Sequence, residues 1–149
     1  MANPAFPANT IQELVALARS RPEPILFGSG GSGSVTHLSF ELLKARTGIR
    51  LTHVPYKSIA PMLTDILGNQ IPLGSPAAAS VVSHVKAGTL KLLAITSARR
   101  SASFPDVPTV QESGIDDYDV SAWNGLLAVS YTHPPSPRDG ATSRMPSSA

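Results

Sequence analysis

Two apolar segments flank the stretch Gly28-Ser29-Gly30-Gly31-Ser32-Gly33-Ser34. The segment before it, residues 25–27, is typical of a short buried strand, and the segment after it carries Leu38, Leu42 and Leu43 at helical spacing. A glycine-rich turn between a strand and a helix leaves the first N–H groups of the helix without intrahelical partners. Because these donors coincide with the positive end of the helix dipole, the turn suits an anion such as a carboxylate or a phosphate.

Strand and helix patterns alternate along the rest of the chain. The patterns predict helices over residues 10–19, 34–48, 58–68, 75–88 and 109–114, and strands over residues 25–27, 49–54, 71–73, 90–96 and 118–128. Such an alternation is typical of an α/β fold with a parallel, doubly wound sheet. The helix N-termini then gather beyond the carboxyl ends of the strands, which is where ligands bind in these folds.

Composition narrows the class of protein. The 149 residues are about the length of one domain, and 12 basic against 10 acidic residues form no basic cluster, so we expect no nucleic-acid partner. With no cysteine and four scattered histidines, we expect neither a metal site nor a disulfide, and no cofactor is expected. No apolar run approaches the ~20 residues of a membrane span, and the first residues lack a signal-peptide pattern, so we expect no direct membrane insertion.

Gly28, Gly30 and Gly33 also fit the pattern G-x-G-x-x-G, which makes a nucleotide-dependent α/β enzyme the alternative hypothesis. The confirming residue would be an acidic side chain ~20 positions further on, at the end of the next strand. Residues 51–55 hold none, and the run lacks the lysine of a phosphate-binding loop, since Ser34 is followed by Val35. The serines also lack the G-x-S-x-G spacing of a hydrolase, so we predict no catalytic residue.

Several motifs in order resemble one family, the Bug-type extracytoplasmic solute receptors of tripartite tricarboxylate transporters. The resemblance covers about residues 8 to 128 and rests on Gly28-Ser29-x-Gly31-x-Gly33-Ser34-x-x-His37-Leu38, His53-Val54-Pro55-Tyr56-Lys57, Ala60-Pro61-x-Leu63-Thr64-Asp65, Val85-Lys86-Ala87-Gly88, Phe104-Pro105-Asp106-Val107-Pro108-Thr109 and Trp123-x-Gly125-Leu126-Leu127-Ala128. The resemblance implies one lobe of a type II periplasmic-binding-protein fold. It also implies a small carboxylated solute as ligand and membrane transporter subunits as partners.

By this resemblance residues 1–117 form the second lobe of a receptor, and residues 118–128 form a strand that returns to a first lobe. Residues 129–149 are rich in proline without apolar periodicity, so we expect a disordered tail, either native or non-native. Full-length members are periplasmic, whereas this chain shows no signal peptide, so a truncated product without function is a further alternative.

The predicted ligand-binding residues lie at three helix starts beyond the sheet. We expect carboxylate capture by Ser29, Gly30, Gly31, Gly33 and Ser34, joined by Tyr56, Ser58 and Ser75. Ser58 and Ser75 replace residue types usual in the family, a glycine and a polar Asp-Asn step. His37, in the first turn of its helix, is expected to be neutral and packed, since the helix dipole disfavours a cation there.

Overall fold

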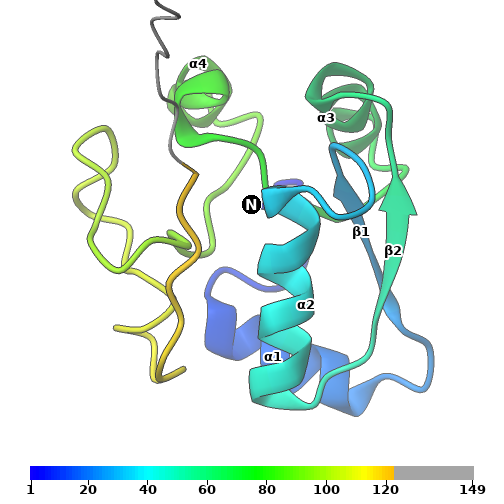
Figure 1. The fold of residues 1–149 in the computed structure, drawn as a ribbon. Coiled ribbons are helices and arrows are strands. Elements are labelled where there is room, and N and C mark those ends of the chain that lie inside the picture. The colour runs from blue at the N-terminus through cyan, green and yellow to red at the C-terminus, as the bar shows by residue number, and fades with distance from the viewer. Residues whose placement is uncertain (123–149) are drawn as a thin grey trace, which may run out of the picture.

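Three parallel strands form the central sheet in the order β2-β1-β3. The computed structural model describes residues 1–122 (Figure 1). The strands are β1 (Ile25–Ser29), β2 (Leu51–Pro55) and β3 (Leu73–Gly74). The helices are α1 (Ile11–Ser20), α2 (Val35–Thr47), α3 (Ile59–Leu67), the short 3-10 helix η1 (Ala78–Ser80) and α4 (Val82–Lys86).

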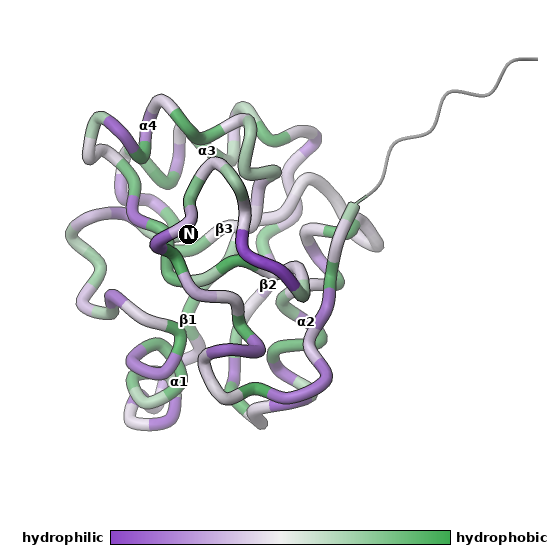
Figure 2. The backbone as a smooth tube through the Cα atoms, turned by 90° about the vertical axis from the view of Figure 1, so that its left-hand side faces the viewer, coloured by the Kyte–Doolittle hydropathy of each residue, from purple (hydrophilic) through white to green (hydrophobic). Residues whose placement is uncertain are grey.

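The first helices begin and end where their capping residues predict. Thr10 accepts the N–H of Glu13 at the start of α1, and Ser34 accepts the N–H of His37 at the start of α2. Gly48 ends α2 in the left-handed conformation (φ 68°), which glycine adopts without steric cost. In Figure 2, α1 alternates between hydrophilic and hydrophobic stretches, as expected of a helix that covers a core with one face.

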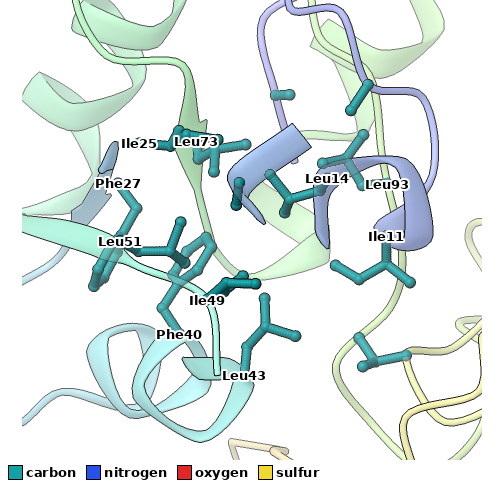
Figure 3. Packing of buried hydrophobic residues seen from close by; sticks show 14 of the residues in the cluster. Ile11, Leu14, Ile25, Phe27, Phe40, Leu43, Ile49, Leu51, Leu73 and Leu93 are labelled. Atoms are coloured by element: carbon teal, nitrogen blue, oxygen red, sulfur yellow. The ribbon is translucent and has the colours of Figure 1, made fainter. Parts of the chain in front are cut away.

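Helices cover both faces of the sheet, which confirms the doubly wound prediction. On one face, Phe27, Leu51 and Leu73 pack in a single apolar cluster with residues of α1 and α2 (Figure 3). On the other face a smaller cluster is built around Met62 and Ile66 of α3. Successive strand residues point to opposite faces, so Ile25 and Phe27 of β1 supply the first cluster while Gly28 faces the second.

The second face depends on two glycines. Gly28 of β1 and Gly74 of β3 are register partners. A Cβ at Gly28 would lie 2.5 Å from Ile71 Cδ1 and 2.7 Å from Met62 Cγ, and a Cβ at Gly74 would lie 2.6 Å from Ile66 Cδ1. The missing side chains therefore let α3 lie directly against the sheet.

The strand predicted over residues 90–96 is wrong for the described structure. Lys91 and Ile95 form only isolated bridges, to Ala2 and Thr109 respectively. Ala2 is fully buried and bridges Leu73 and Lys91 in antiparallel fashion, so the N-terminal residues occupy the position beside β3. A neighbour for β3 thus comes from the start of the chain rather than from the segment with the strongest apolar pattern.

Two predicted helices also differ from the structure. The helix over residues 75–88 is replaced by η1 and α4, because Val81 between them (φ −121°, ψ 1°) leaves the helical conformation as its side chain enters the core. The helix over residues 109–114 is a series of turns. Its capping box nevertheless forms, since Thr109 and Glu112 each accept the other's backbone N–H.

The last predicted elements fall largely outside the described residues. Of the strand predicted over 118–128, residues 118–122 have no regular secondary structure, although the Val120 N–H donates to the Thr96 carbonyl at 2.8 Å. Residues 123–128 and the tail predicted over 129–149 lie outside the described part of the chain.

Candidate functional site

Parallel pairing brings the three predicted helix starts to one edge of the sheet. Ser29, the last residue of β1, is the register partner of Pro55, which ends β2, and the register pair of Gly28 and Gly74 aligns the end of β3. Three segments therefore leave the sheet at the same level: the glycine loop of residues 28–34 after β1, residues 56–58 after β2, and Ser75 after β3. This edge carries all eight of the predicted ligand-binding residues.

The glycine loop, residues 28–34, links β1 to α2 through two glycines in unusual conformations. Gly31 (φ 130°) and Gly33 (φ 77°) lie in the region that favours glycine. Ser34 then begins the helix, and its hydroxyl donates to the Gly31 carbonyl at 2.6 Å. The N-cap therefore also fixes the preceding turn.

Three amides that we predicted as free donors have partners within the chain. The Gly30 N–H donates to Thr36 Oγ1 (3.0 Å), and the Gly33 N–H donates to His37 Nδ1 (3.1 Å). The Gly31 N–H lies 3.2 Å from the hydroxyl of Ser29. These bonds fix the shape of the loop and occupy the donors expected to meet a ligand.

Other amides at the same place remain open. Within residues 1–122, the N–H groups of Ser32, Val35 and Thr36 donate to no other group. Val35 and Thr36 are the first two residues of α2, where the helix supplies no acceptor. Of the open donors, Ser32 lies within the predicted stretch although it was not among the predicted residues, and Val35 and Thr36 lie one and two residues beyond Ser34.

Ser29 supports the loop from inside the protein. Its residue is fully buried, and its Oγ lies 2.6 Å from His53 Nε2 on β2 and 3.0 Å from the Gly31 carbonyl. Ser29 therefore does not reach the surface of the loop, and any contact with solvent or a ligand there is made by the residues that follow it.

His37 and His53 lie behind the loop as a stacked pair. Their ring centroids are 3.9 Å apart with an interplanar angle of 21°, and Phe27 stacks against both rings. Burial lowers the pKa of His53, and the neighbouring imidazole of His37 lowers it further. The prediction of a packed His37 fits this position, whereas the role of His53 was not predicted. One sequence signal could have indicated this role, because His53 lies two residues after buried Leu51 and therefore on the same face of β2.

Tyr56 turns away from the loop toward α3. Its hydroxyl donates to Asp65 Oδ2 at 2.6 Å, and its ring packs in the cluster around Met62. Burial, together with the hydrogen bond to the Asp65 carboxylate, raises the pKa of Tyr56 to about 12. Its backbone N–H donates to the Ser29 carbonyl, so Tyr56 ties β2 to the glycine loop.

Ser58 and Ser75 differ in their surroundings. Ser58 is exposed at the N-cap position of α3 without a side-chain capping bond. Ser75 follows β3 and lines an apolar cavity of about 100 Å³ together with Phe40, Leu73 and Tyr118. It is not the N-cap that the sequence predicted, because η1 begins only after Ala77.

Two general features of the described residues bear on the chemistry. None of their histidine, aspartate and glutamate side chains gather in a group that could hold a metal ion. No helix within residues 1–122 has the length and hydropathy that crossing a bilayer requires. What the site offers is a set of backbone donors at a helix start, which suits reversible anion binding.

Solved structures with this arrangement define the class. The chain superposes on the periplasmic binding protein BugD with a TM-score of 0.74 at 33% identity, over 80% of this chain and 40% of that one. It is also similar to R. palustris Rpa4515 with adipate, with a TM-score of 0.76 at 34% identity, over 79% of this chain and 40% of that one. A third similar structure is MatC from Rhodopseudomonas palustris with bound malate, with a TM-score of 0.74 at 26% identity, over 80% of this chain and 40% of that one. The fold is that of a periplasmic solute-binding protein.

The sequence assigns the family. The profile of the tripartite tricarboxylate transporter family receptors matches residues 1–138, and the chain belongs to this family. Protein BugT of Bordetella pertussis is 34% identical over 132 residues, which are 89% of this chain and 40% of that protein. A UPF0065 protein of Agrobacterium vitis is 36% identical over 126 residues (85% and 36%). The chain thus spans 36–40% of the length of these relatives.

Proposed function

We propose that this chain forms one lobe of a two-lobed receptor that binds a small carboxylated solute for a tripartite tricarboxylate transporter. The observation that carries the proposal is the set of open amides of Ser32, Val35 and Thr36 at the start of α2. A carboxylate placed there accepts backbone hydrogen bonds at the positive end of the helix dipole. Membership in the receptor family, together with neighbours described with adipate and malate, supports a carboxylate over other anions.

The proposed second lobe comprises residues 1–117, with residues 118–128 returning to a first lobe and residues 129–149 as a tail. A partner lobe would close over the sheet edge that carries the glycine loop and Ser75. The proposed partners are the membrane subunits of the transporter, and the proposed location is the periplasm, in keeping with BugD. Binding of this kind needs no covalent step, in accord with a family of receptors rather than enzymes.

The nucleotide alternative loses one of its three glycines to packing. Gly28, the first glycine of the pattern, lies under Met62 and Ile71, which accounts for its lack of a side chain without any ligand. Gly30 has ordinary space around it, with Ile59 and Thr36 at 3.6 and 3.8 Å from an added Cβ. No observation on the described residues favours a dinucleotide.

The test is a titration of the ¹⁵N-labelled 149-residue chain with adipate or malate. The expected result is saturable shifts of the amides of Ser32, Val35 and Thr36, with millimolar or weaker affinity, because one lobe supplies only part of the contacts. The matched control ligand is 1,6-hexanediol, which has the chain of adipate without its charges and should leave these amides unmoved. NADPH binding in preference to adipate would support the enzyme alternative instead.

A further inference from the structure

The Nδ1 atom of His37 accepts a hydrogen bond from the glycine loop. The backbone N–H of Gly33 is a donor and can only donate, so Nδ1 of His37 must be the acceptor of the 3.1 Å bond between them. The neutral ring then carries its proton on Nε2, which lies 3.5 Å from Glu41 Oε1. The orientation of the Gly33 peptide is thus set by an unprotonated imidazole nitrogen.

His53 fixes the other side of the same loop. Its Nε2 lies 2.6 Å from the hydroxyl of Ser29, which also lies 3.0 Å from the Gly31 carbonyl and 3.2 Å from the Gly31 nitrogen. The two imidazoles stack in direct contact, with their centroids 3.9 Å apart. The pair therefore bonds directly to Gly33, and it reaches Gly31 through the hydroxyl of Ser29.

We propose that His37 and His53 are positioning residues of the solute site, and that a proton on His37 Nδ1 releases Gly33 and weakens solute binding. This inference rests on the proposed function. An imidazolium donates from both nitrogens, so its Nδ1–H would face the Gly33 N–H, and two donors cannot bond. The peptide of Gly33 then loses its anchor immediately before Ser34, which caps the helix whose first amides meet the solute.

Few charged groups act on the pair. From α2, the carboxylate of Glu41 favours proton uptake, and Lys44, which lies 2.9 Å from Glu41, offsets it. From the strands, β1 contributes Phe27 and Ser29, neither of which changes charge near neutral pH, and β2 contributes His53 itself. Burial, and then the adjacent ring of His37, lower the pKa of His53 and so disfavour a cation on that ring.

The test uses two substitutions of His37 in the 149-residue chain. His37→Asn places Oδ1 near the position of Nδ1, so it keeps an acceptor for Gly33 but takes up no proton. His37→Phe keeps the aromatic stack and lacks the acceptor. Together they separate the hydrogen bond from the packing of the ring.

The first measurement follows the Gly33 amide of the ligand-free chain by NMR from about pH 8 to about pH 5, the range in which imidazoles titrate. We expect the Gly33 signal of the wild type to move with the same midpoint as the His37 ring signals, and that of His37→Asn to stay in place. A Gly33 signal that titrates equally in His37→Asn, or that ignores the His37 titration, would overturn the proposal.

The second measurement compares adipate affinities at the two ends of this range. The protonation of adipate itself affects all variants equally. The ratio of wild-type to His37→Asn affinity therefore reports only the effect of pH on the protein. We expect the wild type to lose about 2- to 10-fold relative to His37→Asn at the acidic end, as for the loss of one hydrogen bond. His37→Phe should bind weakly throughout. A pH-independent ratio contradicts the proposal, whereas no adipate binding at any pH refutes the proposed function and leaves the amide titration to decide the role of His37.

Discussion

Gly28 and Gly74 lie opposite each other on adjacent parallel strands, and the side chains of α3 occupy the space above both of them. The two positions are not equivalent. An added Cβ at Gly28 would meet Met62 at Cγ, near the backbone of α3, as well as Ile71 Cδ1. An added Cβ at Gly74 would meet chiefly the terminal Cδ1 of Ile66, which can turn aside.

Gly28→Ala is therefore expected to destabilise the protein by about 1–3 kcal/mol, as overpacking in a core does. Gly74→Ala is expected to cost less, since only the end of a flexible side chain must move. Urea denaturation of the two variants measures the difference. Met62→Ala in the Gly28→Ala background should recover part of the loss, and equal costs at the two glycines would contradict this account of the packing.

Ser34→Ala should cost about 1 kcal/mol of unfolding free energy, because Ser34 Oγ caps α2 at the His37 N–H. Ser58→Ala is the matched control, since Ser58 occupies the same position on α3 without a side-chain capping bond, and it should cost a few tenths. Thermal or urea unfolding followed by circular dichroism gives both values. In the solute titration, Ser34→Ala should also weaken binding, as the Ser34 hydroxyl holds the Gly31 carbonyl.

Tyr118→Phe should destabilise the protein more than Tyr56→Phe. The Tyr118 hydroxyl is buried and donates to the Ser39 carbonyl at 2.7 Å, which joins residue 118 to α2. Loss of this bond is expected to cost about 0.5–1.5 kcal/mol. Tyr56 is only half-buried, and Asp65 can turn to water when its partner is removed. Chemical denaturation of the two variants decides the order, and a larger effect at Tyr56 would contradict it.

Acid should weaken the turns around residue 112 through one carboxylate. The backbone N–H of Thr109 and then the Arg100 guanidinium hold the pKa of Glu112 below its usual value. A carboxyl with a lowered folded-state pKa contributes stability that is complete above its unfolded pKa and is lost as the pH falls through the folded value. Carbon NMR of the Glu112 carboxyl should show the lowered midpoint, and Arg100→Gln should raise it. A midpoint unchanged by Arg100→Gln would show that the ion pair of 2.8 Å has no influence in solution.

The sequence predicts those elements whose signals are local. Thr10, Ser34 and Gly48 mark helix boundaries correctly because each acts on backbone groups within four residues. The strand over 90–96 fails because strand formation depends on a neighbour, and Ala2, remote in sequence, meets it at a single bridge. The capping box at Thr109 forms without a helix because its reciprocal bonds need only one turn.

The same distinction holds for the candidate site. That a loop rich in glycine stands before a helix is local information, and the loop and its cap were predicted. That Ser29 meets His53 depends on the parallel register of β1 and β2, which no local pattern encodes. The amides of Gly30 and Gly33 are occupied by side chains of α2, so which donors stay open depends on rotamers chosen by packing.

The position of Gly28 has a consequence for comparing proteins by their glycine patterns. A motif of three glycines counts as one signal in a search, yet here two of the three answer different steric demands and Gly30 has ordinary space around it. Gly28 admits a helix, Gly33 permits a left-handed turn, and neither demand concerns a bound molecule. A chain can therefore acquire a dinucleotide fingerprint through selection for architecture alone, and such matches carry weight only after each glycine's own neighbours have been inspected.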